Sequence, residues 1–446
     1  MVTDMFKAGP MKALLSWWIG CFIILVAVFA SGATNADALS RFVGDYPTRP
    51  VNQRLHFDRV SEVLPVNLID ARLAGSSPTP GGFMFTIPND PRILDINDLD
   101  RYNGYWVPGP KDLERRIIYR SQFGLQGRLF SAAAGAMNLD RKATVALFEG
   151  VAAAALAAML AIIILLIRRC WGDRPAIAAL VFCALSTGFN LFASSLYWVA
   201  FLHVAPAAVT SAALLSRDVG RVSWAGAYML MLILFIAKFL SGFEFLTVTV
   251  AAAAVPFFLA FSVERITAGR LVRHSAAVFA TGVLALGLAM AFYDRQHLEA
   301  FGTSGLAHLS SRTDVWIAQS AKGVVDHARD LAKVALVNFI DYRGFGVPNI
   351  VVFAIGGYFL LKSARTLISL DLGSQRARVE LAVAAAFAAS VSWFILQEQH
   401  VVFHARYSAY LMAYPFGMIL AAGAVRLLQL RGAAVRPTAG PRAVQA

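Results

Sequence analysis

The chain has little charge, few acidic residues and almost no cysteine. Of its 446 residues only 15% are charged and 58% are hydrophobic, whereas an average soluble domain is about a quarter charged. This composition is typical of an integral membrane protein. The three cysteines are Cys21, Cys170 and Cys183. The first and third lie in expected membrane spans and the second at a cytoplasmic end, so we expect neither an outside disulfide nor a thiol-based active site.

Glycine-rich phosphate-binding motifs are also missing. The sequence holds no G-x-x-x-x-G-K-[ST] and no G-x-G-x-x-G after a strand, which are the motifs of nucleotide-binding loops. Use of a soluble nucleotide is therefore unsupported. We expect no required cofactor and no nucleic-acid partner.

Apolar runs long enough to cross a bilayer are abundant. Crossing about 30 Å of hydrocarbon takes about 20 largely apolar residues, with a range of about 17 to 25. The sequence predicts an all-α integral membrane protein with about ten transmembrane helices, at residues 13–30, 145–167, 175–193, 199–216, 222–240, 245–262, 275–293, 349–363, 379–396 and 407–426.

The first span has an alternative interpretation. Small residues at 30–33 resemble a signal-peptidase site, but the apolar stretch 13–30 is longer than the roughly 7 to 15 residues of a signal sequence. A retained anchor is therefore favoured over a cleaved signal.

The basic residues behind the net charge of +13 lie where the positive-inside rule predicts them. With the N-terminus in the cytoplasm, alternate turns and the tail carry the basic residues, namely Lys7, Lys12, Arg168, Arg169, Arg174, Arg217, Arg221, Arg265, Arg270, Arg273, Lys362, Arg365, Arg376, Arg378, Arg426, Arg431, Arg436 and Arg442. Both termini are predicted to be cytoplasmic. The alanine-rich, arginine-preferring composition is typical of a GC-rich bacterial genome, so the expected membrane is a bacterial inner membrane.

Two long external loops divide the chain, because residues 31–144 and 294–348 are too long to be simple connections. They separate an N-terminal segment with the first span (1–30), spans two to seven (145–293), spans eight to ten (349–426) and a basic tail (427–446). Residues 111–136 predict an interfacial helix, with Leu113, Ile117, Phe123, Leu129 and Phe130 on its buried face and Arg115, Arg116, Arg120 and Arg128 on its headgroup face. Residues 313–340 predict a second helix. For both helices, a lid packed on the bundle is the alternative.

Five polar clusters fall on the outer face in this topology: Asp45–Tyr46, Ser194–Trp198, Lys238 with Glu244, Asp341–Arg343 and His400–Tyr407. Ionisable groups at membrane depth cost roughly 2.5 to 3.5 kcal/mol each on insertion scales. Their convergence on one face indicates a functional cavity.

The acidic candidates lie early in the first loop. Asp45 is placed to take a proton from a hydroxyl as a general base, and Asp58 is the rival position. The adjacent Arg59 makes an ion pair the alternative for Asp58, and a turn or capping role is the alternative for either.

The cationic candidates lie at the outer ends of later membrane spans. Lys238 with Glu244 is either a partly buried pair or part of a phosphate-and-sugar site, and snorkelling would explain the lysine alone. Tyr197 and Trp198 are belt anchors or site-shaping residues.

The densest cluster stands between spans nine and ten. Arg406, with His404 beside it, suits a phosphate because its donors are always charged. A metal held by Glu398, His400 and His404 is a weak alternative, since the pattern is not His-Glu-x-x-His.

Three segments resemble the GT-C class of membrane glycosyltransferases, in its bacterial surface-polysaccharide type. They are residues 119–127, 195–198 and 238–245, and the order of one span, a long outer loop and a multi-span remainder resembles that class as well. The resemblance implies a sugar donor linked to polyprenyl phosphate, Asp45 as the first-loop carboxylate, and Lys238 and Arg406 as the cations that hold the lipid phosphate. The choice of base between Asp45 and Asp58 stays open, and His404 and Arg343 are further candidate phosphate ligands. Residues that would shape the site are Tyr46, Gln122, Tyr197, Trp198, Glu244 and Tyr407. Many members carry a paired acidic dipeptide early in this loop, whereas Asp45 stands between Gly44 and Tyr46.

The expected function is therefore an inverting glycosyltransferase that uses a polyprenyl-phosphate sugar and a lipid-linked or cell-envelope glycan acceptor. The alternatives are an O-antigen or polysaccharide polymerase or ligase that uses lipid pyrophosphate, and a lipid-linked sugar transporter or flippase. The early position of the long loop speaks against the polymerase and ligase, and the absence of a visible internal repeat speaks against a transporter.

Overall fold

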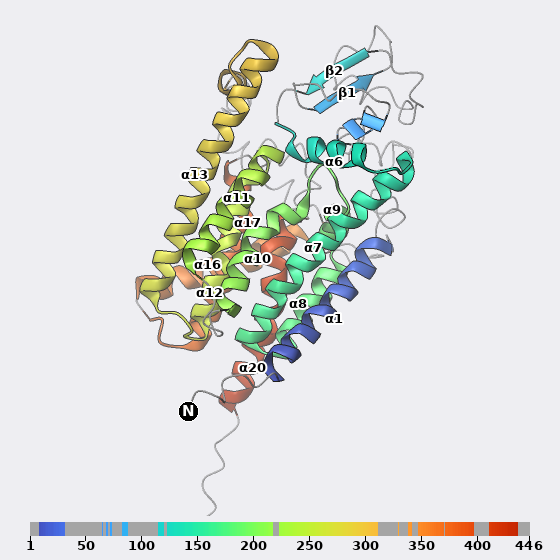
Figure 1. Ribbon diagram of the computed structural model, residues 1–446. Helices are drawn as coiled ribbons and strands as arrows, with labels where there is room; N and C mark the ends of the chain where they lie inside the picture. The colour runs from blue at the N-terminus through green and yellow to red at the C-terminus, as the bar shows by residue number, and fades with distance from the viewer. Residues whose placement is uncertain are drawn as a thin grey trace, which may run out of the picture.

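A helical bundle forms the body of the protein. The computed structural model describes residues 9–31, 65, 68–69, 72–73, 83–87, 115–119, 123–216, 223–310, 329, 338–340, 347–369, 371–396 and 410–435. The bundle helices are α1 (Gly9–Ser31), α7 (Arg141–Trp171), α8 (Asp173–Leu185), α9 (Thr187–Ala193), α10 (Ala200–Ser216), α11 (Trp224–Ser241), α12 (Leu246–Ser262), α13 (Ala268–Phe301), α16 (Asn349–Ile368), α17 (Gln375–Leu396), η3 (Met412–Gly417) and α20 (Met418–Val435). Figure 1 shows them side by side.

Within the described ranges, seven helical segments are long and apolar enough to cross a membrane. They are α1, α7, α11, α13, α16, α17 and the segment from η3 into α20. The protein is therefore a multi-pass membrane protein. Every predicted span coincides with a helix or a pair of helices, but α10 and α12 have 17 residues each and α8 has 13. Helix α8 is too short for a full crossing and α10 and α12 lie at the lower limit of about 17 residues, so the expected number of about ten is not confirmed.

The predicted span 175–193 is interrupted at Ser186, in its second half along the sequence. Helix α8 ends at Leu185 and α9 begins at Thr187, with Ser186 between them. The Ser186 side chain accepts a hydrogen bond from Phe189 N, and the Asn190 amide donates to the carbonyls of Ala184 and Ser186 at 3.0 and 2.8 Å. The break is tolerated because side chains satisfy the backbone groups that a continuous helix would have paired.

The predicted helix 111–136 is wrong in its first part. Residues 115–119 form strand β2, which pairs antiparallel with β1 (Phe83–Ile87), and the helix α6 covers Leu125–Ala136 only. The run Arg115-Arg116-Ile117-Ile118-Tyr119 has β-branched and aromatic residues that suit a strand. Gly124, in the left-handed conformation at φ 71°, starts the helix after it.

The predicted faces of this helix also differ from the structure. Leu129 is 60% exposed, while Gln126, Gly127, Ser131 and Ala134 are buried. Arg128 is not fully at the surface, because its guanidinium lies over the Phe123 ring at 4.8 Å, and burial lowers its pKa. The buried face of α6 is thus made of small and polar residues, which allow a close approach to the bundle.

The second predicted loop helix is wrong at its end. Asn338–Ile340 form strand β3, which pairs antiparallel with β4 (Val347–Pro348). Residue 329 is helical, and the rest of 313–337 lies outside the described residues.

The two ends of the bundle differ in charge. At one end, which we call the basic end, Trp171 donates to Ser262 at 2.8 Å, Arg378 pairs with Glu264 at 2.6 Å and Arg168 lies over Trp17 at 4.6 Å. These contacts bring together arginine-rich turns that the sequence separates. At the other end, which we call the α6 end, α6 lies across the tops of the bundle helices (Figure 1). The gathering of basic turns matches the charge asymmetry predicted from the sequence.

Candidate functional site

A buried cation marks the α6 end of the bundle. Lys238 lies in the last turn of α11 and is only 2% exposed. Its ammonium donates to the carbonyl of Gly242 at 2.9 Å, and the charge of Glu244 acts on it across the same turn. Within the described residues this single hydrogen bond leaves two ammonium donors unused. A buried ammonium with spare donors is suited to an anionic group.

Gln126 joins three segments of the chain at this end. Its amide nitrogen donates to the carbonyls of Tyr197 and Ser241, both at 2.8 Å. These bonds tie α6 to the turn before α10 and to the end of α11, next to Lys238. The amide oxygen of Gln126 is buried without a partner among the described residues. Helix α6 is therefore fixed next to the Lys238 turn, with one acceptor left open among the described residues.

Aromatic rings form a layer beneath these turns. Trp198 stacks on Phe245 with ring centroids 5.3 Å apart and an interplanar angle of 17°, and Tyr197 meets Trp198 edge-on at 5.1 Å. Phe245 also packs edge-on against Trp393 of α17. The rings are buried, with Phe245 1% and Trp198 6% exposed, so the layer fills the bundle interior beside the cation with apolar side chains.

The backbone is strained at two of these aromatic turns. Val199 has φ 42° and Phe245 has φ 61°, both in the left-handed region that residues other than glycine rarely adopt. A β-branched residue such as valine is an outlier there. Such conformations persist where the surrounding contacts fix them, and they cluster at functional sites.

A second polar layer lies deeper in the bundle. His203 Nδ1 is 3.2 Å from the hydroxyl of Thr249, which itself donates to the Phe245 carbonyl at 2.9 Å. Because the Thr249 hydrogen is used there, His203 Nδ1 is the donor and Nε2 carries a lone pair. That Nε2 and the hydroxyls of Tyr410 and Tyr414 are buried without partners among the described residues. The deeper layer therefore has both acceptor and donor groups to offer.

The structure brings together some of the predicted site residues. Lys238, Glu244, Tyr197 and Trp198 lie around the Gln126 contacts at the α6 end. The other predicted site residues lie outside the described residues: Asp45, Tyr46, Asp58, Gln122, Asp341, Arg343, Glu398, His400, His404, Arg406 and Tyr407. Their roles stay predictions, as does the metal alternative at 398–404. Across the described part of the chain, no group of three or more metal-ligating side chains occurs.

Sequence reasoning missed Gln126, His203 and Tyr410. Gln126 had a usable signal, since it lies between Phe123 and Phe130 at helical spacing and is therefore a polar residue on an apolar face. His203 and Tyr410 read as ordinary polar residues near span ends. Only the packing of α10, α12 and the segment before η3 shows that they face one another, with ring centroids 5.8 Å apart.

Comparisons with known proteins add little. No family model and no curated protein sequence matches the chain. Among solved structures, the chain is similar to the apo form of the Archaeoglobus fulgidus oligosaccharyltransferase, with 14% identity and a TM-score of 0.42 over 94% of this chain and 50% of that one. This chain spans half the length of that protein, and a TM-score at this level does not establish a shared fold. The functional inference therefore depends on this chain's own residues.

Proposed function

We propose that this protein is an inverting glycosyltransferase acting on the outer face of a bacterial inner membrane. The donor is a sugar linked to polyprenyl phosphate, and the acceptor is a lipid-linked or cell-envelope glycan. Lys238 is the observation that carries the proposal: it is buried, it has two donors without a partner among the described residues, and it lies where α11 ends. A lipid phosphate at the membrane surface would meet it there.

The neighbours of Lys238 support a sugar beside that phosphate. The stacked pair of Trp198 and Phe245 gives the turn an apolar surrounding, and the Gln126 amide oxygen, which has no partner among the described residues, is available to accept a hydrogen bond from a hydroxyl. When no anion is bound, the negative charge of Glu244 partly compensates the positive charge of Lys238. Cation, aromatic layer and open acceptor together fit a phosphate-linked sugar better than they fit an apolar lipid alone.

In the proposed reaction, Asp45 takes the proton of an acceptor hydroxyl while that oxygen attacks the anomeric carbon. The bond from the anomeric carbon to the phosphate oxygen breaks, and polyprenyl phosphate leaves with the negative charge. Lys238 and Arg406 stabilise the charge that develops on the phosphate, because donors fixed in advance need no reorganisation. Asp58 is the alternative base.

The test is transfer from a radiolabelled polyprenyl-phosphate sugar by the purified chain in lipid nanodiscs, with candidate acceptors. Lys238→Met, Asp45→Asn and Arg406→Ala should each abolish product formation while the protein stays folded. Lys142→Met is the matched control, since Lys142 is an exposed lysine at the start of α7. Parental transfer by folded Lys238→Met would overturn the assignment of Lys238. Movement of intact lipid across liposomes without product would favour the flippase.

A further inference from the structure

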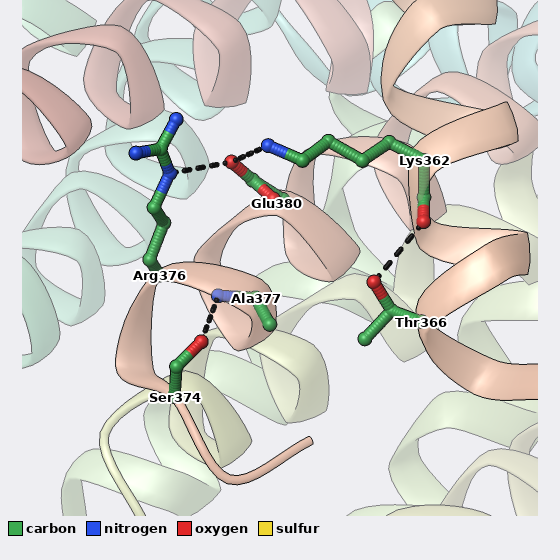
Figure 2. Close-up of polar contacts among 6 residues, drawn as sticks. All are labelled: Lys362, Thr366, Ser374, Arg376, Ala377 and Glu380. Carbon is green, nitrogen blue, oxygen red and sulfur yellow. Dashed lines mark hydrogen bonds and ion pairs between the residues drawn. The ribbon is translucent and has the colours of Figure 1, made fainter. Parts of the chain in front are cut away.

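A carboxylate shared by two cations lies near the basic end of the bundle. Glu380, in the second turn of α17, has a side chain only 5% exposed. One of its oxygens, Oε1, accepts from Lys362 of α16 at 2.6 Å and from Arg376 at 3.0 Å (Figure 2). The three side chains join α16 to α17 one to two turns from the connection at 369–374.

The charges in this cluster do not balance. A single carboxylate faces two cations, so the group carries one surplus positive charge. The Arg376 side chain is 46% exposed and uses only Nε on Glu380. Its two terminal nitrogens point away from the carboxylate (Figure 2). Within the described residues these donors have no protein partner, so a guanidinium edge is free to bind an anion.

An exposed apolar stripe leads away from this cluster along α16. Val351, Tyr358 and Leu361 lie on one face of the helix, and Leu361 is 68% exposed. Arg365 continues the same face one turn beyond Leu361 and is exposed as well. Lys362 lies beside the stripe with its ammonium 5.8 Å from the Tyr358 ring. The stripe runs from the cations toward the middle of the membrane span.

We propose that this surface binds one anionic phospholipid. The phosphodiester accepts hydrogen bonds from the terminal nitrogens of Arg376 and is flanked by Arg365 and Lys362. The acyl chains lie along Leu361, Tyr358 and Val351, in the direction that chains take from a headgroup into the bilayer. Basic pockets between transmembrane helices on the cytoplasmic side are recognised sites for anionic headgroups, and the positive-inside rule places the basic end on that side.

The alternative is a purely structural role, in which the cluster only holds α16 against α17. That role explains less of the arrangement. One cation is sufficient to compensate a buried carboxylate, and a second long side chain adds little when half of it is exposed to solvent. Arg376 and Arg365 also lie at the same end of an apolar stripe that faces lipid. The surplus cation, its free donors and the stripe fit a zwitterionic lipid poorly and an anionic lipid well.

The experiment is a lipid titration of the intact chain in detergent, followed by native mass spectrometry. Phosphatidylglycerol and phosphatidylcholine with identical acyl chains serve as probes. The double variant R365Q/R376Q should weaken phosphatidylglycerol binding by about 30-fold, because two cations at about 1 kcal/mol each amount to about 2 kcal/mol, and it should leave phosphatidylcholine binding unchanged. Arg295→Gln is the control, because Arg295 is exposed on α13 and pairs with Glu299 far from this cluster. Equal phosphatidylglycerol binding by the parent and a folded double variant would overturn the proposal.

A second variant decides the matter if the double variant does not fold. Glu380→Gln keeps the shape of the buried side chain but removes the carboxylate that competes for both cations. Phosphatidylglycerol should then bind several-fold more tightly than to the parent. If Glu380→Gln gave no gain in phosphatidylglycerol binding, the cations would not be a lipid site.

Discussion

The side-chain amide of Gln126 donates a hydrogen bond of 2.8 Å to the backbone carbonyl of Tyr197. The second amide hydrogen goes to the carbonyl of Ser241, so one side chain satisfies two carbonyls at the ends of other helices. Both carbonyls are buried where water does not reach them easily. The position of α6 over the bundle therefore depends on a donor with two hydrogens at residue 126.

Replacement of Gln126 by Leu should destabilise the protein, because two buried carbonyls lose their donor. Each such loss costs about 1–3 kcal/mol. We expect a clear drop in the melting temperature of the detergent-purified protein, measured by intrinsic fluorescence. Gln429→Leu is the control, since among the described residues the Gln429 side chain accepts a single weak 3.4 Å contact from Arg426. Similar melting temperatures for the two variants would contradict a docking role for Gln126.

Lys238→Met should leave the melting temperature nearly unchanged or raise it. The substitution removes a buried ammonium, which is costly at membrane depth by roughly 2.5–3.5 kcal/mol, and it strands the Gly242 carbonyl, which costs about 1–3 kcal/mol. The two effects largely offset each other. A drop of more than a few degrees, measured by the same fluorescence melt, would indicate that Lys238 is kept for structure.

Two neighbouring glycines of α16 should respond oppositely to alanine. A Cβ at residue 356 would collide with the Phe387 ring of α17, whereas a Cβ at residue 357 meets nothing within 4 Å. Phe387 cannot move aside freely because it packs against Phe416 at 4.9 Å. Gly356→Ala should destabilise by about 1–3 kcal/mol through overpacking, and Gly357→Ala should be neutral or stabilise by up to about 1 kcal/mol. Unfolding curves in mixed micelles would measure both.

Trp171 and Ser262 should be energetically coupled across the basic end. The indole N–H donates to the Ser262 hydroxyl at 2.8 Å in a fully buried setting. A double-mutant cycle of Trp171→Phe and Ser262→Ala should give a coupling of about 1 kcal/mol. The control cycle combines Trp18→Phe with Ser262→Ala, because the Trp18 indole nitrogen has no partner among the described residues. Equal coupling in the two cycles would mean that the bond contributes nothing.

The proposed orientation can be checked by thiol labelling in intact cells. Residue 373 lies in the α16–α17 connection at the basic end, and Glu299 is exposed near the end of α13, the opposite end of the bundle. The native cysteines are buried, so background labelling should be low. An impermeant maleimide should label Glu299→Cys directly and Gly373→Cys only after permeabilisation. The reverse pattern would place the α6 end in the cytoplasm.

The helices of the bundle could be predicted well from the sequence, because apolar length is a strong signal. The run at 145–167 predicts most of α7, and 222–240 predicts α11 within a few residues. What the sequence could not predict were the interruptions. The apolar pattern at 175–193 is continuous, and only the capping by Ser186 and the amide of Asn190 break it.

Part of the candidate site could be predicted from residue type rather than from apolar length. A lysine inside an apolar span stands out at once, so Lys238 and its neighbour Glu244 could be singled out from residue type alone. Gln126 had a sequence signal as a polar residue at helical spacing between two phenylalanines, but its partners are backbone carbonyls far along the chain that the sequence does not reveal. His203 became visible only through its contact with Thr249. The strand at Arg115–Tyr119 was missed because its arginines fit a helical face as well as a strand.

The shortness of α12 bears on how the protein is made. Its 17 residues span about 25 Å at 1.5 Å per residue, less than the hydrocarbon thickness of about 30 Å, and most of its surface is buried against other helices rather than exposed to lipid. One of its main neighbours, α17, is synthesised more than a hundred residues later. Nascent chains that stop before residue 375 would therefore hold α12 without that cover, and membrane proteases should remove such truncated products faster than the full-length chain.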